Sequence, residues 1–154
     1  MDRPNDLPAL PDAGIVLAAT ADDWRAAVEI AGDALTASGA TQAGYTADMV
    51  RMIEDRGPYV VVAPGLALAH ARPGATVKRD GLAIVTLAEP VAFGHPYNDP
   101  VRVIVALAGA SSASHLRIIA ESANIFNDTD AVERLAAATD ADAVREILGV
   151  RADD

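Results

Sequence analysis

The sequence predicts an α/β protein, a single-domain α/β/α sandwich in which a mixed central sheet of about four or five strands is flanked by helices on both faces. Apolar residues recur at helical spacing near both ends of the chain, whereas short β-branched runs occupy its middle. The runs at 82–88 and 101–108 are apolar on both faces, as is typical of strands buried in a central sheet. With 154 residues, 51% of them hydrophobic, the chain is long enough to bury one such core. The strand order does not follow from the sequence.

The domain is expected to begin after an N-terminal arm. Residues 1–13 carry three prolines and little apolar pattern, which indicates a flexible segment. The domain itself is expected over residues 14–149, with a short C-terminal tail at 150–154. Its first helix has Thr20 as a candidate cap and Gly39 as its stop.

The remaining elements follow from turn residues and from the period of the apolar positions. Gly57-Pro58 ends a helix, and the β-branched residues between it and Pro64-Gly65 indicate a strand, which residues 66–69 either extend or re-form. Asp140 and Gly149 are the expected cap and stop of the last helix. The expected strands lie at 15–17, 59–62, 66–69, 82–88 and 101–108, and the later helices at 43–55, from 111 onward, at 130–138 and at 141–148.

Charge and composition exclude several function classes. The net charge of −10 would repel a phosphate backbone, so we expect no nucleic-acid partner. An acidic surface attracts a basic protein, although solubility alone also explains it. No apolar run approaches the ~18–20 residues of a membrane span and no leader opens the chain, which indicates a cytoplasmic protein without membrane insertion. Because the chain has no cysteine, it can form no disulfide or thiolate metal site.

His70 is the first candidate for chemistry. Residues 66–69 deliver it at the end of a strand, and the small residues Ala69 and Ala71 flank it, which would let a bulky protein approach the backbone. An imidazole with an ordinary pKa of about 6.5 is largely neutral at pH 7 and can act as a nitrogen nucleophile. A structural histidine in the core is the competing interpretation.

His115 is the second candidate, because it falls in the first turn of a helix. Ser114 and the serines before it offer hydroxyl groups that cap such a helix. The free N–H groups and partial positive charge of a helix start favour an anion, and a histidine there can donate to a phosphoryl oxygen. An exposed histidine without a partner is the alternative. His95 is interpreted as a residue of a surface turn, outside the site.

Arg72 and Arg56 could neutralise a phosphoryl oxygen, and both are equally compatible with solvated surface arginines. A metal site is weakly indicated, because the spacings of 25 and 20 residues between the three histidines match no compact ligand pattern. The sequence contains no nucleophile elbow, P-loop or dinucleotide-binding glycine pattern. We therefore expect no metal and no organic cofactor.

These residues together resemble the mannitol/fructose-type enzyme IIA family of the sugar phosphotransferase system, and within it the ascorbate-specific branch most of all. The resemblance extends from about Ile15 to Leu148. Its most specific stretch is GPYVVVAPGLALAHARP at 57–73, followed in order by EPVAFG at 89–94 with NDPV at 98–101, and by Ser114-His115-Leu116.

The resemblance implies a function and its partners. Family members take a phosphoryl group from the histidine phosphocarrier protein onto one histidine and pass it to a cysteine of the enzyme IIB component, which serves a membrane-embedded IIC. By position, His70 corresponds to the phosphorylated histidine and His115 to the second histidine of the site. The family usually has proline immediately before the phosphorylated histidine, whereas this chain has Ala69.

Two other functions stay open at this point. One is a regulatory module of the same fold, in which phosphorylated His70 signals to another protein. The other is a small metal-dependent hydrolase that uses the histidines. The transported sugar cannot be identified, because enzyme IIA does not touch it, and the oligomeric state is also open, a homodimer being one option.

Overall fold

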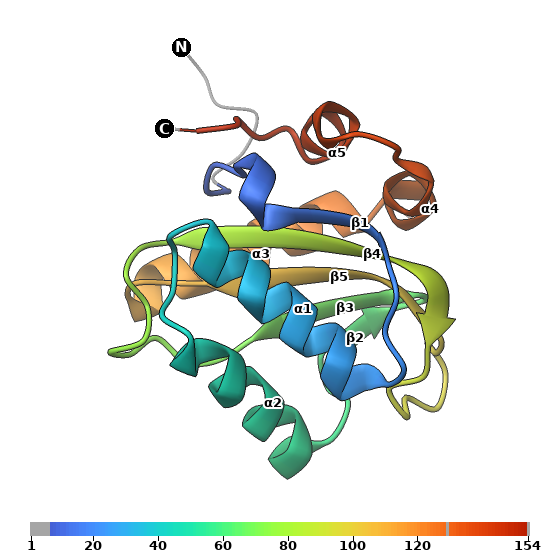
Figure 1. The fold of residues 1–154 in the computed structure, drawn as a ribbon, viewed down its shortest axis with the longest axis horizontal. Coiled ribbons are helices and arrows are strands. Elements are labelled where there is room, and N and C mark those ends of the chain that lie inside the picture. The colour runs from blue at the N-terminus through green and yellow to red at the C-terminus, as the bar shows by residue number, and fades with distance from the viewer. Residues whose placement is uncertain (1–6, 129, 154) are drawn as a thin grey trace.

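The structure, a computed structural model, describes residues 7–128 and 130–153. In this part of the chain, a short 3-10 turn and one strand precede two helices, and four consecutive strands and then three helices follow (Figure 1). In chain order the elements are η1 (Asp12–Gly14), β1 (Ile15–Ala19), α1 (Trp24–Ala37), α2 (Gly44–Arg56), β2 (Val61–Ala63), β3 (Leu66–His70), β4 (Gly81–Val91), β5 (Val101–Ala108), α3 (Ser112–Phe126), α4 (Asp130–Ala137) and α5 (Ala141–Leu148).

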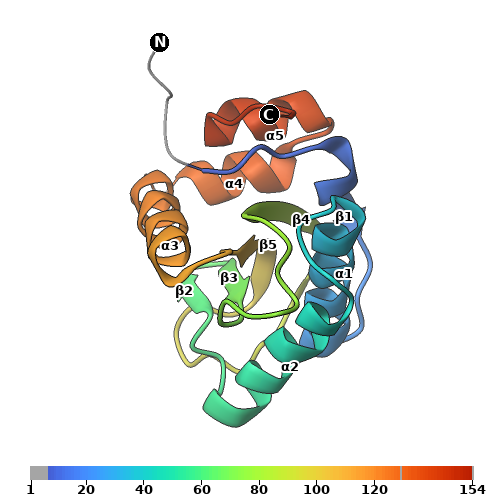
Figure 2. The same cartoon turned by 90° about the vertical axis from the view of Figure 1, so that its left-hand side faces the viewer.

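The five strands form one mixed sheet in the order β1-β4-β5-β3-β2. The pairs β1/β4 and β3/β5 are parallel, whereas β4/β5 and β2/β3 are antiparallel. Helices α1 and α2 cover one face, and α3, α4 and α5 lie on the other (Figure 2). The predicted α/β/α sandwich is therefore confirmed.

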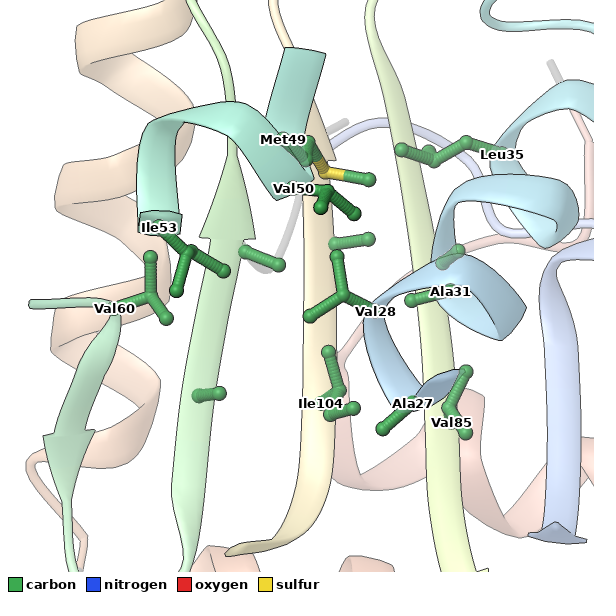
Figure 3. Close-up of a cluster of buried hydrophobic side chains, with 14 of the residues drawn as sticks. Ala27, Val28, Ala31, Leu35, Met49, Val50, Ile53, Val60, Val85 and Ile104 are labelled. Carbon is green, nitrogen blue, oxygen red and sulfur yellow. The ribbon is translucent and has the colours of Figure 1, made fainter. Parts of the chain in front are cut away.

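Alternation along β5 explains why two separate cores form. Ile104 and Ala106 pack with α1 and α2, while Val103, Val105 and Leu107 pack with the helices of the opposite face. Successive side chains of a strand point to opposite faces, so a strand that is apolar throughout needs cover on both sides. Figure 3 shows the first of these clusters, in which Val28 and Met49 lie over the sheet near Ile104.

The first helix begins later than the sequence analysis expected. Asp23, and not Thr20, is its N-cap: the carboxylate accepts a hydrogen bond from the Ala26 N–H at 2.8 Å. A carboxylate at the cap satisfies a helix-start N–H and complements the helix dipole, which a hydroxyl three residues earlier cannot do. The expected cap Asp140 and stop Gly149 of α5 are both confirmed, with Gly149 at φ +69°.

The strand expected at 59–62 is the short β2, and residues 66–70 re-form as the separate, antiparallel strand β3. Pro64-Gly65 makes the turn between them, and Gly65 has a φ of +78° that favours glycine. Strand β3 is thereby turned inward, where it pairs with the central strand β5 and carries His70 at its end.

Part of the expected flexible arm is packed against the domain. Leu7 and Leu10 are buried in the core beneath α4 and α5. The Leu10 N–H donates to the Arg151 carbonyl at 2.8 Å, and the Arg145 Nε–H donates to the Leu10 carbonyl at 2.8 Å. The buried leucines and these hydrogen bonds hold this part of the chain against the domain. The expectation of a flexible arm up to residue 13 is therefore wrong for residues 7–13. Residues 1–6 lie outside the described part.

In the part of the chain that the structure describes, none of the helices combines the length and the apolar character that crossing a membrane requires.

Candidate functional site

His70 is the last residue of β3, and its register partner is Leu107 in the parallel strand β5. The carboxyl ends of two parallel strands meet at the same edge of a sheet, which is where ligand sites of α/β proteins form. After β5 the chain turns directly into α3, so His115 in the first turn of that helix reaches the same edge. The two candidate histidines lie together, with ring centroids 5.3 Å apart and ring planes inclined by 58°.

One hydrogen bond fixes the tautomer of His70. Its Nδ1 lies 3.0 Å from the Leu68 carbonyl oxygen, which can only accept, so Nδ1 carries the proton. In the neutral ring Nε2 then has a free lone pair. Burial lowers the pKa of His70, and the bond to Leu68 offsets part of that effect. A neutral His70 ring at the end of β3 thus has the free nitrogen lone pair that a nucleophile needs.

His115 favours the opposite tautomer. Its Nδ1 is buried and has no hydrogen-bond partner among the described residues. Buried N–H groups without an acceptor are rarer in proteins than buried acceptors without a donor, so we assign the proton to Nε2. Burial lowers the pKa of His115, and the charge of nearby His70 lowers it further. The pair therefore combines a free lone pair on His70 with an N–H donor on the ring beside it.

Gly109 allows α3 to start so close to the sheet. A Cβ atom at this position would lie 2.5 Å from the His115 Cα and 2.6 Å from its Cβ. Atoms in proteins do not approach so closely, and any side chain here would push the first turn of α3 away from β5. Glycine at the end of β5 is what brings His115 to His70.

Ser111 and Ser114 build the start of α3 and take no part in the ring pair. The Ser111 hydroxyl accepts from the Ser114 N–H at 3.1 Å, and the Ser114 hydroxyl accepts from the Ser111 N–H at 3.1 Å. This reciprocal capping box holds the first turn that carries His115. Ser114 is buried and its hydroxyl is used in the cap. A hydroxyl that binds a phosphoryl group directly would instead be accessible at the site.

Tyr59 completes one side of the site. Its ring meets that of His70 edge to face, with centroids 5.7 Å apart. Arg56 and Arg72 are both close enough to counter the burial-driven rise in the pKa of Tyr59. Both arginines are exposed, and they line a cavity of about 550 Å³ beside the chain that follows His70. The two predicted arginines thus lie near Tyr59, at a cavity whose lining includes Ala71 but neither His70 nor His115.

Ala69, which replaces the proline usual in the family, is fully buried inside β3 and paired with Ala106. The Leu68 N–H donates to Val60 of the hairpin β2/β3 at 2.8 Å. Because N–H groups alternate in direction along a strand, the Ala69 N–H points to the other neighbour, β5. This alanine supplies a donor to the sheet that a proline would lack.

His95 lies at the opposite end of the sheet, in the loop between β4 and β5. Its Nδ1 accepts hydrogen bonds from the N–H groups of Tyr97 and Asn98, both at 3.1 Å. This position of His95, away from His70, agrees with its interpretation as a turn residue outside the site. Among residues 7–128 and 130–153, no three histidine, aspartate or glutamate side chains gather as a protein metal site requires.

Sequence reasoning missed three residues that shape this site. Gly109 and Tyr59 are two of them, and the third is Tyr45, whose buried hydroxyl bonds to backbone on both sides of the site. Tyr59 lies in the signature stretch and could have been found there. Nothing in the local sequence of Tyr45 indicates hydrogen bonds to the backbone of Ala71 and Leu107, and nothing beside Gly109 indicates its close approach to His115.

The chain is similar to a known protein family and to characterised proteins. A family model described as "Phosphoenolpyruvate-dependent sugar phosphotransferase system, EIIA 2" matches residues 10–149. An ascorbate-specific PTS system EIIA component of Shigella flexneri is 39% identical over 124 residues, which cover 80% of this chain and 80% of that protein.

Solved structures show the same fold. The complex of enzyme IIAMTL and phosphorylated enzyme IIBMTL from Escherichia coli contains a similar chain, with a TM-score of 0.78 and 25% identity, covering 90% of this chain and 96% of that one. The nitrogen regulatory protein IIA-Ntr from Neisseria meningitidis has a TM-score of 0.76 and 27% identity, covering 90% and 95% of the two chains.

Proposed function

The chain belongs to the EIIA 2 family of the phosphoenolpyruvate-dependent sugar phosphotransferase system, and we propose that His70 is the residue on which it carries the phosphoryl group. As a member of this family the protein is a phosphotransferase, a carrier that passes phosphate on to an enzyme IIB component. The observation that supports His70 is its tautomer: Nδ1–H donates to the Leu68 carbonyl, and Nε2 is free beside His115.

In the transfer step, the Nε2 lone pair of His70 attacks phosphorus in line with the nitrogen–phosphorus bond of the donor. That bond breaks as the new one forms, and the bonding electron pair returns to the donor nitrogen. The product ring carries Nδ1–H and phosphorylated Nε2, hence a formal positive charge. The Leu68 carbonyl faces that Nδ1–H and stabilises the charge without moving.

His115 is the group that binds the phosphoryl oxygens. Its Nε2–H donates to an oxygen that gains charge as the phosphoryl group arrives, and the start of α3 adds its dipole. The phosphoryl group on the ring carries about two negative charges, as phosphoryl groups on other side chains do at pH 7. Arg56 and Arg72 supply positive charge at the rim, and Ser114 acts indirectly by capping the helix that holds His115. Positioning and charge neutralisation thus account for the step, with no metal or organic cofactor.

The partners follow from the family. The donor is the histidine phosphocarrier protein, the acceptor is the cysteine of an enzyme IIB component, and the sugar enters through a membrane IIC that this chain does not touch. The work is done in the cytoplasm, where those partners meet. Similarity to ascorbate-specific EIIA components supports ascorbate as the transported compound.

Phosphoryl transfer from phosphoenolpyruvate tests the assignment. Purified protein is incubated with labelled phosphoenolpyruvate, enzyme I and the phosphocarrier, and the label is mapped. We expect acid-labile, base-stable label in the wild-type protein and in the His95→Ala control, and none in His70→Ala. Label retained by His70→Ala but lost by His115→Ala would reverse the two roles.

A regulatory role is the second candidate, favoured by the similarity to the nitrogen regulatory protein IIA-Ntr. Phosphorylation of His70 would then be read by another protein instead of feeding a IIB component. Transfer from the phosphorylated protein to a purified ascorbate-type IIB distinguishes the two, since a regulatory module would keep its label.

A further inference from the structure

We propose that Tyr45 is a positioning residue for the phosphoryl-transfer site: its hydroxyl holds the ends of β3 and β5 at the separation that places His70 beside His115. This inference rests on the proposed function of His70. Tyr45 touches neither imidazole in any contact given by the structure, and it acts through the backbone on which they stand.

Tyr45 comes from the first turn of α2 and is fully buried beneath the sheet edge. Its hydroxyl oxygen accepts a hydrogen bond from the Ala71 N–H at 3.0 Å and donates one to the Leu107 carbonyl at 2.6 Å. Ala71 is the residue immediately after His70, and Leu107 is the register partner of His70. One side chain is thus bonded to both strands at the level of the nucleophile.

The hydroxyl stands where the next hydrogen bond of the sheet would form. The Leu68 N–H points to the β2 side, so the N–H groups of Ala69 and Ala71 point to β5. In a parallel pair with His70 opposite Leu107, the Ala71 N–H would donate directly to the Leu107 carbonyl. The tyrosine oxygen lies between these two groups. The strand ends are therefore joined by two hydrogen bonds through this oxygen atom, and they lie farther apart than one direct hydrogen bond would hold them.

This separation affects the distance between the two histidines, because each histidine lies at or just beyond one of the two strand ends. His70 is the last residue of β3, and β5 continues through Gly109 into the helix start that carries His115. The ring spacing of 5.3 Å is therefore set by the strand spacing. Burial raises the pKa of Tyr45 to about 12, so the hydroxyl keeps its proton and can both donate and accept at neutral pH.

The variant Tyr45→Phe removes the hydroxyl and keeps the ring in the core. We expect single-turnover phosphorylation by the phosphorylated phosphocarrier to slow by about 10–100-fold, as a small displacement of aligned reactants does. We also expect the NMR titration midpoints of His70 and His115 to move from their wild-type values, because the rings change both their spacing and their burial.

Two controls separate positioning from stability. Tyr97→Phe removes a hydroxyl from a tyrosine that is 88% exposed at the opposite end of the sheet, and should change neither readout. Leu148→Ala deletes buried area from α5, in the core on the opposite face of the sheet, so it should lower the melting temperature while leaving the rate and the midpoints near wild type. A Tyr45→Phe protein that is destabilised like Leu148→Ala, with wild-type rate and midpoints, overturns the inference.

A second measurement serves if Tyr45→Phe does not fold. The chain has three tyrosines, so in a Tyr59→Phe, Tyr97→Phe background biosynthetic 3-fluorotyrosine labels Tyr45 alone. Fluorination makes the hydroxyl a stronger donor and a weaker acceptor, and should shift the histidine midpoints relative to the unlabelled background; unchanged midpoints contradict the role. If wild-type protein accepts no phosphate, the proposed function fails, yet the titrations still decide the role of Tyr45.

Discussion

The His70 and His115 rings lie 5.3 Å apart with complementary tautomers: the His70 Nδ1–H donates to the Leu68 carbonyl, whereas the His115 Nδ1 is buried without a hydrogen-bond partner in the described part of the chain. In the proposed function, this relationship divides the tasks of phosphoryl transfer between the two imidazoles. One ring provides a lone pair, and the other provides an N–H group. Each assignment leads to a different expected phenotype.

Removal of the His115 donor should affect the departure of the phosphoryl group more than its arrival. His115→Ala keeps the nucleophile intact and should still be phosphorylated. Onward transfer to IIB should slow by about 10²–10³-fold, the usual effect of losing one preorganised donor. His115→Gln should recover part of the rate, because its amide can donate. Single-turnover transfer from purified phosphoprotein measures this, and a wild-type rate in His115→Ala would remove His115 from the site.

Gly109→Ala should damage the site without altering any chemical group in it. The new Cβ would lie 2.5 Å from the His115 Cα, so the first turn of α3 must move. We expect a loss of about 1–3 kcal/mol in the free energy of unfolding and transfer as slow as in His115→Ala. Gly74→Ala is the matched control, since a Cβ there meets no atom within 4 Å. Equal behaviour of the two variants in denaturant titration and transfer would show that Gly109 is not required.

The stability of the protein should fall in mildly acidic solution because of His70. Burial lowers the pKa of His70 below its ordinary 6.5, so the unfolded chain binds the proton first as the pH falls. The contribution of the neutral ring is complete above pH 6.5 and is lost as the pH falls through the pKa of the folded state. Denaturant titrations at about pH 7.5 and about pH 5.5 should show a larger loss for wild type than for His70→Gln. An equal loss would contradict the assignment.

The rate at which the protein accepts the phosphoryl group should depend on the same protonation of His70. The protonated ring has no lone pair on Nε2, so the rate should be flat above pH 6.5 and should decline only at the lower, folded-state pKa of His70. Single-turnover phosphorylation across this range measures it. A midpoint at or above 6.5 would show that burial does not control His70.

Ala69→Pro should destabilise this chain even though proline is usual there in the family. Ala69 is fully buried in β3, and its N–H faces β5. Proline removes that donor and leaves a carbonyl of β5 unpaired, at a cost of about 1–3 kcal/mol. Thermal unfolding should therefore show a lower midpoint than wild type. An unchanged or higher midpoint would mean that the N–H is not used in the sheet.

The sequence predicted most of the fold, because most of its elements are marked by local chemistry. Residues 101–108 are apolar on both faces and form the central strand, and Asp140 with Gly149 delimits the last helix. Leu7 and Leu10 were missed because a leucine pair between prolines has no periodicity, and their burial follows from the apolar cluster that they share with α4 and α5.

His70 and His115 were identified from their types, their positions at a strand end and a helix start, and the family resemblance. Those signals belong to the chain itself and need no knowledge of the fold. Imidazole reactivity near pH 7 is an intrinsic property, and a helix start favours an anion wherever the helix lies.

The tertiary structure alone decided how these groups meet. Sheet order places β3 beside β5, Gly109 admits the helix start, and the Tyr45 hydroxyl sets the separation of the strand ends. The same holds for the tautomers, since the Leu68 carbonyl and the burial of the His115 Nδ1 exist only once the chain is folded. Distances, burial and hydrogen-bond partners join residues far apart in the chain, and local residue patterns carry no information about such contacts.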